Sequence, residues 1–445
     1  MMTEYVHKFC REAKASGIEK LNFYVEERIS RELSLYQGAL EHMQRSDVKQ
    51  VFVEGLVEGR SGSVFLENLD ETLIPEYIRD LKENAQLSDK SFEPYDLSGL
   101  DQITAMQYQF SSLEDTVEAM RRAEQAAYDT DSRIASGVQI HVQETGFYYT
   151  LADENENFAT DAILGGRAGI HLVARDGEDV QPGGKGKPFH GADIPDMEVM
   201  AREAAESAVS RLAAQSYPTG TYPVVLDARV SAELLDAFMP AFFAGNIQSR
   251  MSVLAGRLGE QLAGENISIL EDPAMPGGFC TRRFDDEGVP CRAKAIVDQG
   301  KLNCWLYNRQ TARKDDCSSG GNGFKAHFNE AVSTGYTNVF IPKGCSTREE
   351  LLGQMGNGLL ITAVSGVFAG ARPNSGDFSL ISSGYVVEEG KIGRAVNQIT
   401  IAGNFFEMLK SVLAIGNDEH WMIASNGNVC TPSMYVASLA ISGKE

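Results

Sequence analysis

The segment from Ser216 to Pro223 most constrains the fold, because it separates two parts of the chain that differ in hydrophobic periodicity. It holds two prolines and a glycine between segments with regular apolar spacing, and such residues interrupt helices and central strands. The chain has 445 residues, which predicts two or three domains because a domain commonly holds about 150 residues. We therefore expect an N-terminal domain over residues 1–216 and a C-terminal domain over residues 217–445.

The part before this segment shows both helical and strand periodicity. Near the N-terminus, apolar residues repeat at helical spacing and Gly17 follows where such a helix would end; they are Val6, Phe9, Cys10 and Ala13. Further helices are expected after Asp70, from Ser112 and over residues 196–214. Strands are expected where apolar residues alternate or cluster, at 21–25, 51–53, 64–66 and 138–142. The glycines and prolines of residues 181–188 predict a loop.

The part after the segment is typical of strands and turns. Residues 297–302 and 387–392 each place a glycine after two polar residues and between apolar ones, as a tight hairpin requires. A short helix is expected over residues 405–413. The sequence therefore predicts an α+β protein, in which a mixed helix-and-strand N-terminal domain precedes a β-rich C-terminal domain.

The charge balance excludes two classes of partner. The chain has 62 acidic and 40 basic residues, for a formal net charge of −22. Such a surface repels phosphate backbones and anionic membranes, and no block of five or more basic residues offsets it. We therefore expect no nucleic-acid partner and no membrane partner.

The seven cysteines are odd in number, widely spaced and without a CxxC pair. This pattern is typical of free thiols in a reducing compartment. The N-terminal residues lack the apolar stretch of a signal peptide, and no run of 18 apolar residues occurs. A cytoplasmic protein is expected.

The histidines are not spaced in the way that zinc ligands on a helix are. A zinc-peptidase helix carries two histidines one turn apart with a neighbouring glutamate, whereas none of the seven histidines here is followed by glutamate. A site assembled from distant residues such as His420 and Cys430 stays open. Such a pair is more often an unrelated loop histidine and buried thiol than a shared site.

Two other segments could carry chemistry. Asp285, Asp286 and Glu287 are consecutive carboxylates, which can bind a hard cation or raise one another's pKa; a structural turn before Gly288 and Pro290 is the favoured interpretation. Residues 317–324 are rich in glycine but lack the lysine of a phosphate-binding loop. Ser365-Gly366 lacks the preceding glycine of a serine nucleophile elbow.

Six segments of the second half form a recognisable series. In chain order they are Phe284–Pro290, Ser318–Gly323, Asn338–Gly344, Gly376–Ser379, Gln398–Asn404 and Cys430–Pro432. Together they resemble segments that occur in the same order in the TldD/PmbA family, also called modulator of DNA gyrase. The resemblance covers nearly the whole chain and is most specific in the second half.

This resemblance implies a role within a pair of subunits. In the family, TldD subunits carry a HExxxH zinc helix and cleave unfolded peptides, whereas PmbA (TldE) subunits lack the zinc site. An ungapped count from residues 256–260 places that motif at Leu235–Pro240, where no histidine stands. The resemblance therefore places the chain in the PmbA/TldE branch. No catalytic, metal or cofactor-binding residue can be carried over, and zinc is expected in a TldD-like partner.

The expected partners are a TldD-like subunit in a heterodimer, a second copy in a homodimer, and an unfolded peptide. One alternative is an independent peptidase or hydrolase that uses Cys430 or the carboxylates from Asp285 to Glu287. Another is a regulator linked to DNA gyrase, which the acidic charge disfavours.

Overall fold

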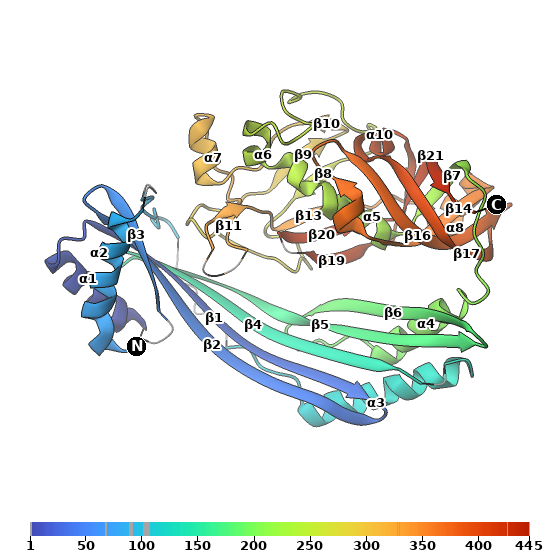
Figure 1. Cartoon of the computed structure of the whole chain (residues 1–445), viewed down its shortest axis with the longest axis horizontal. Helices are drawn as coiled ribbons and strands as arrows, with labels where there is room; N and C mark the ends of the chain where they lie inside the picture. The colour runs from blue at the N-terminus through green and yellow to red at the C-terminus, as the bar shows by residue number, and fades with distance from the viewer. Residues whose placement is uncertain are drawn as a thin grey trace.

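The structure is a computed structural model that describes residues 2–66, 69–88, 92–100, 107–134, 136–326, 328, 330–424 and 426–444. The first half is built on one long, curved antiparallel sheet with six strands (Figure 1). In sheet order its strands are β3 (Arg60–Leu66), β2 (Ala39–Val57), β1 (Lys20–Tyr36), β4 (Gln139–Asp153), β5 (Phe158–Asp176) and β6 (Asp179–His190).

Helices cover one face of this sheet. They are α1 (Met2–Ala15), η1 (Glu71–Leu73), α2 (Ile74–Gln86), α3 (Leu113–Thr130) and α4 (Met197–Val209). Side chains alternate between the two faces of a strand, and β1 directs Phe23 and Val25 into the core under α1 and α2. On the same face of β1, Leu33 and Leu35 pack under α3 and α4. The opposite face carries Tyr24 and is covered by the second half of the chain (Figure 1).

The second half contains three sheets and short helices. One sheet has the order β10-β9-β8-β13-β20-β19, a pair is formed by β11 and β12, and the third has the order β14-β7-β21-β17-β16-β15, with β18 paired to β21. The strands are β7 (Gly220–Leu226), β8 (Ile269–Glu271), β9 (Lys294–Asp298), β10 (Lys301–Leu302), β11 (Gly323–Phe324), β12 (Ser333–Thr334), β13 (Asn338–Phe340), β14 (Gly358–Ser365), β15 (Ala371–Arg372), β16 (Asp377–Glu388), β17 (Lys391–Asn404), β18 (Val412–Ile415), β19 (His420–Ala424), β20 (Gly427–Thr431) and β21 (Met434–Ser442).

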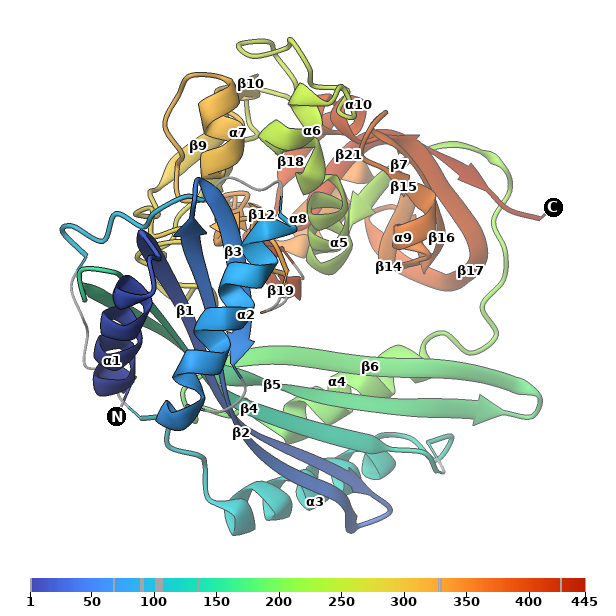
Figure 2. The ribbon, with the colours of Figure 1, turned by 60° about the vertical axis from the view of Figure 1, so that its left-hand side comes forward.

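The helices of this half lie between and beside these sheets (Figure 2). They are α5 (Ala228–Phe238), η2 (Met239–Phe242), α6 (Ala244–Gln248), α7 (Arg309–Lys314), α8 (Arg348–Met355), α9 (Val367–Gly370) and α10 (Phe405–Lys410). The largest hydrophobic core lies here, around Phe238 and Phe405, whose rings stack at 4.6 Å. The α+β class is confirmed, because a strand-rich second half follows a mixed first half.

Several local predictions are confirmed. Ser112 caps α3 by accepting from the Asp115 amide, and Gly17 follows α1 with a φ of 85°. Both predicted hairpins form, as β9–β10 and β16–β17. In each turn two residues have positive φ, for example 47° at Gln299 and 79° at Gly300, as a two-residue hairpin turn requires.

The prediction of a loop over residues 181–188 is wrong, because these residues form most of β6. The strand lies at the edge of the sheet and pairs only with β5 among the described strands. An edge position tolerates Pro182 and Pro188, since it does not require every backbone donor. At Gly183 an added Cβ would lie 2.3 Å from the Ala204 carbonyl oxygen, so glycine here allows α4 to approach closely.

Two predicted helices extend too far. The helix predicted over 196–214 ends at Val209. The helix predicted over 405–413 ends at Lys410, after which β18 begins at Val412. Apolar residues in both segments continue beyond the helix end, so periodicity alone could not locate the last turn.

The junction near residue 216 lies between α4 and β7. The described strands before it all belong to the long sheet, and those after it belong to the other three sheets. A single backbone bridge joins Gln215 to Val396. The division into domains at 216 and 217 stays a prediction.

Candidate functional site

The candidate site is a cleft of about 1170 Å³ between the second half of the chain and the face of the long sheet that carries Tyr24. Its floor consists of β1, β4 and β5, with contributions from β2, β3 and β6. Its other wall comes from residues 278–282, Asp286, residues 324–326, Phe328, Ser333, Gly335–Tyr336, Ile423, Ala424 and residues 426–428. Both halves of the chain are therefore needed to form it.

Strand register arranges the floor in rows. One row runs across Gln50, Glu26 and Tyr149. The next row on the same face includes Arg28, Phe147 and Ile163, because these residues are paired across β1, β4 and β5. Farther along the sheet, Gln143 pairs with Arg167. The floor thus presents charged, polar and aromatic side chains to the cleft.

Aromatic side chains join the two walls at the rim. His190, the last residue of β6, stacks on Phe279 with ring centroids 4.2 Å apart and an interplanar angle of 6°. Its Nε2 lies 3.2 Å from the Gly277 carbonyl oxygen. Phe279 in turn meets Trp421 of β19 edge to face at 5.5 Å. These contacts fix the loop 277–280 against the end of β6.

A buried ion pair forms part of the deeper wall. Arg282 donates to Asp286 at 2.7 Å, and both side chains are almost fully buried. The Arg282 guanidinium also lies 3.9 Å from the centre of the Tyr149 ring, a cation–π geometry that joins the wall to the floor. Asp286 additionally accepts from the Lys325 amide at 2.8 Å.

Glu26 is the other carboxylate in the cleft. Burial raises its pKa to about 6, while Arg28, Arg282 and Lys325 lower it and Asp286 raises it further. An acidic group with a raised pKa can change charge near neutral pH.

The consecutive carboxylates 285–287 serve mainly to hold a turn together. Asp285 is fully buried, and its carboxylate accepts from the backbone amides of Glu287, Val289 and Gly323 at 2.8–3.0 Å. Burial raises its pKa to about 8. Glu287 accepts from the Arg309 amide at 2.7 Å. Because the three carboxylates point to different partners, they do not form a shared cation site, and the structural interpretation is the one that the geometry favours.

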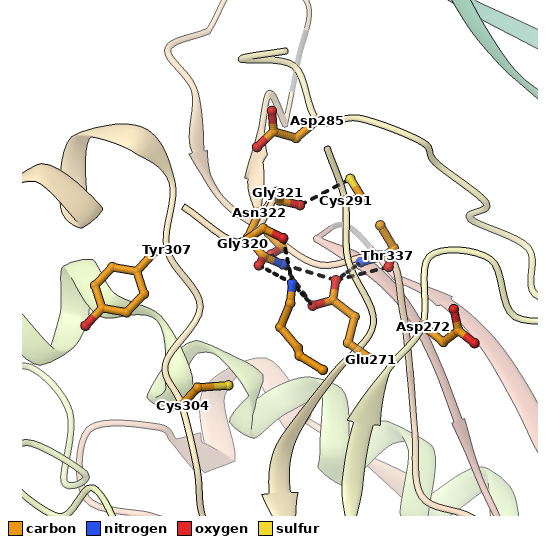
Figure 3. A network of polar contacts seen from close by, with 12 residues as sticks. Glu271, Asp272, Asp285, Cys291, Cys304, Tyr307, Gly320, Gly321, Asn322 and Thr337 are labelled. Carbon is orange, nitrogen blue, oxygen red and sulfur yellow. Dashed lines mark hydrogen bonds and ion pairs between the residues drawn. The ribbon is translucent and has the colours of Figure 1, made fainter. Parts of the chain in front are cut away.

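A second buried network lies behind the glycine-rich loop (Figure 3). Lys294 donates to Glu271 at 2.9 Å, to the Gly320 carbonyl at 2.9 Å and to Asn322 at 2.7 Å. Glu271 also accepts from Asn322 and from the amide and hydroxyl of Thr337. Charge compensation and full hydrogen bonding make this network a support for the loop rather than an open site.

The segment where the family's zinc motif would stand lies in α5 and η2. Leu235 and Phe238 are fully buried in the hydrophobic core, and Pro240 lies in the 3₁₀ helix η2. Asp236 accepts a hydrogen bond from the Tyr336 hydroxyl. The residues of this segment offer apolar groups and one hydrogen-bonded carboxylate, so they do not fit a tetrahedral zinc site.

The distant pair His420 and Cys430 does not form a nucleophile with its base. On the paired strands β19 and β20, His420 lies opposite Thr431 and Cys430 lies opposite Trp421. Paired residues share a face and successive residues alternate, so the two side chains point to opposite faces. Burial raises the pKa of the Cys430 thiol to about 12, which disfavours the reactive thiolate.

The other sequence features are placed as follows. All seven cysteines are free thiols, as predicted. Among the residues that the structure describes, no group of three or more His, Cys, Asp or Glu side chains is arranged to hold a metal ion. His327 lies outside the described residues. The searched helices include none with the length and apolar character needed to cross a membrane.

The residues of the cleft were missed by the sequence analysis. Arg28 and Arg167 are single charges within alternating strands, and Phe279 and Tyr336 belong to irregular segments or a turn. The alternation of β1 could have placed Glu26 and Arg28 on one face. Only the pairing of β1 with β4, and of β4 with β5, brings Arg167 onto that face.

The fold defines an α+β protein, and two family models match most of the chain. The PmbA/TldA metallopeptidase central domain matches residues 110–212, and the PmbA/TldA metallopeptidase C-terminal domain matches residues 219–443. The chain therefore belongs to the PmbA/TldD family, as the resemblance predicted.

Curated relatives and solved structures agree with this assignment. The chain is 26% identical to Metalloprotease PmbA of Escherichia coli O157:H7, over 81% of this chain and 76% of that protein. It is 28% identical to a PmbA homologue of Haemophilus influenzae, over 80% of this chain and 75% of that protein. A Thermotoga maritima structure, described as a candidate modulator of a DNA gyrase, matches with a TM-score of 0.88 and 27% identity over 99% of this chain and all of that one.

The structure of TldE from Thermococcus kodakarensis has the same fold. Its TM-score is 0.84 at 18% identity, and the match covers 99% of this chain and 100% of that chain.

Proposed function

We propose that this chain is the PmbA/TldE-type subunit of a two-subunit metallopeptidase that acts on unfolded peptides. In this proposal the chain receives part of the peptide in its cleft, and a TldD-like partner supplies zinc and hydrolysis. The proposal includes a cytoplasmic location, which the seven free cysteines support.

The cleft is the observation that carries the proposal. Its volume of about 1170 Å³ exceeds that of common small-molecule pockets, about 300–1,000 Å³, and suits a segment of polypeptide. Its floor offers aromatic rings at Phe147 and Tyr149. Strand β19 lies at the edge of its sheet, and its residues Ile423 and Ala424 line the cleft. An exposed strand edge can pair with the backbone of an extended peptide regardless of its sequence.

The assignment of hydrolysis to a partner rests on chemistry. A zinc peptidase polarises the scissile carbonyl and generates hydroxide on the metal. The segment 235–240 supplies no imidazole, and Leu235 is fully buried in the core. Cys430 has a raised thiol pKa and faces away from His420. Asp285 is committed to three backbone amides.

An exposed apolar surface supports a subunit contact. Phe368 of α9 is fully exposed, and Ile381 of the adjacent strand β16 is also exposed. α9 contacts β16, and exposed large apolar groups on adjoining elements favour a protein partner. A stable pair would bury more than about 1,200 Å² in total.

The test is a titration of this chain into a zinc-loaded TldD-like subunit, with cleavage of an unfolded peptide as the readout. We expect each chain alone to be inactive and the mixture to cleave, with activity saturating near one chain per partner. Phe368→Asp should weaken the pairing. A control must replace an exposed apolar residue without disturbing packing, and Phe110 does not serve because it packs with Tyr108. Leu87→Asp is the matched control, since Leu87 is a large, exposed apolar residue at the end of α2.

Two results would contradict the proposal. The first is a TldD-like subunit that is fully active alone and unaffected by saturating amounts of this chain. The second is stoichiometric zinc in this chain together with robust peptide cleavage by the pure protein. The second result would favour the alternative of an independent peptidase.

A further inference from the structure

The charges that line the cleft are opposite in balance to those of the whole chain. The chain has 62 acidic and 40 basic residues. Among the described residues that line the cleft, the basic ones are Arg28, Arg167, Arg282 and Lys325, and the acidic ones are Glu26 and Asp286. A basic cleft within an acidic surface concentrates the field on ligands of negative charge.

The other two basic residues of the cleft, Arg282 and Lys325, already have partners within the chain. Arg282 and Asp286 form an ion pair at 2.7 Å with both side chains buried. Lys325 donates to the Glu330 carbonyl at 3.1 Å and lies 4.0 Å from the centre of the Phe52 ring. These groups shape the wall and leave little freedom to meet a ligand.

Arg28 and Arg167 differ from them. Both side chains are exposed on the floor of the cleft. Within the described part of the chain, neither guanidinium has a hydrogen bond or an ion pair with another side chain. Glu26 lies two residues from Arg28 on the same face of β1, and burial raises its pKa to about 6. The floor therefore carries two available cations.

The register sets the separation of these two arginines. Arg28 lies opposite Phe147, Gln143 lies four residues earlier on β4, and Gln143 lies opposite Arg167 on β5. Four residues along a strand and two strand spacings across the sheet give a Cα separation of about 16 Å. An extended peptide spans that distance with about five residues.

We propose that the cleft selects acidic segments of unfolded polypeptide, with carboxylates of the ligand bound by Arg28 and Arg167. This inference rests on the proposed function and adds the substrate class. Planar guanidinium groups bind carboxylates with two parallel hydrogen bonds, so two such contacts on one floor fix the position of a peptide whose backbone contacts are independent of sequence.

The experiment measures binding of labelled unfolded peptides of equal length to the full chain by fluorescence anisotropy. The peptides share one neutral sequence and carry glutamate, glutamine or lysine at two positions about five residues apart. At low salt we expect the glutamate peptide to bind about tenfold more tightly than the glutamine peptide, and the lysine peptide to bind most weakly. High salt should reduce these differences because the arginines are exposed.

Arg28→Gln/Arg167→Gln should raise the Kd of the glutamate peptide to that of the glutamine peptide. The Kd of the glutamine peptide should stay within about twofold of its value for the native chain. The matched control is Arg11→Gln/Arg202→Gln, which removes the same charge from α1 and α4 on the opposite face of the sheet. It should preserve the preference.

The outcomes separate this inference from the proposed function. Equal affinity for the three peptides, or a preference that survives Arg28→Gln/Arg167→Gln, overturns the acidic selectivity and leaves the peptide-binding role standing. Loss of preference in the control variant shows an effect of net charge and also overturns it. Binding of none of the peptides contradicts the proposed cleft function itself.

Discussion

Glu26 gives the cleft a charge that depends on pH. It lies on β1 two residues from Arg28, next to Gln50 and Tyr149 in its row, and it senses Arg282, Asp286 and Lys325 from the opposite wall. Because its pKa is raised to about 6, it is mainly ionised at pH 7.5 and mainly neutral below 6. A neutral Glu26 no longer repels a bound carboxylate.

Affinity for the glutamate peptide should therefore increase as the pH falls from 7.5 to 5.5, a range in which ordinary peptide carboxylates stay ionised. Glu26→Gln should bind at pH 7.5 as tightly as the native chain does at low pH and should flatten this part of the profile. Anisotropy titrations across the pH range provide the measurement. An unchanged slope in Glu26→Gln would assign the effect to another group.

Lys294 shows how one residue supports a whole loop. Its ammonium connects Glu271, the Gly320 carbonyl and Asn322 in a buried setting. Removal of one partner of a buried ion pair leaves an uncompensated charge, which costs about 3–5 kcal/mol. Lys294→Met should accordingly lower the thermal unfolding temperature markedly.

The control is Lys301→Met on β10, because Lys301 is exposed in the same sheet and should change stability by less than about 0.5 kcal/mol. Thermal unfolding followed by circular dichroism compares the two. Similar melting temperatures for both variants would mean that the network contributes little.

At the level of elements, β6 depends on glycine for its contact with α4. A Cβ added at Gly183 would lie 2.3 Å from the Ala204 carbonyl oxygen and 2.8 Å from the Ala208 Cβ, whereas one at Gly186 would meet only the Ala168 carbonyl at 3.9 Å. Contacts below 3 Å force the helix away from the sheet, since packed interiors have little free space.

Gly183→Ala should thus destabilise the protein by about 1–3 kcal/mol. Gly186→Ala on the same strand should remain within about 0.5 kcal/mol of the native chain. Thermal unfolding of both variants checks this difference. Equal stability would show that α4 can shift without cost.

The same strand explains a failure of the sequence analysis. Glycine and proline punctuate loops in most sequences, but β6 is an edge strand, where proline is tolerated, and a packed helix requires a small residue at Gly183. Both conditions come from neighbours that are distant in sequence. By contrast, the turns at Gln299–Gly300 and Glu389–Gly390 depend only on local backbone conformation, and the sequence predicted both hairpins.

For the whole molecule, the two halves contact each other at several places. Tyr24 of the long sheet packs with Phe284 and Phe328 of the second half, and the Arg283 amide donates to Asp161 at 2.7 Å. Pro218 and Thr219 are exposed in the segment that connects the halves.

Limited proteolysis should therefore cut the chain near residues 216–220, because exposed segments at a domain junction are the preferred sites. The two fragments should remain associated during gel filtration, since buried contacts join them. Mass spectrometry locates the cut. First cleavage inside the long sheet would contradict the predicted boundary.

The sequence by itself determined the class of the protein, many of its local elements and its family. Helix caps, hairpin turns and strand alternation arise from interactions among residues close in the chain, and the segments from Phe284 to Pro432 carried the resemblance. Only the tertiary structure decided where the cleft lies and which residues line it. Glu26, Arg167 and Phe279 come from two strands and a loop, and long-range strand pairing and the curvature of the sheet bring them together. Neither leaves a local signal in the sequence.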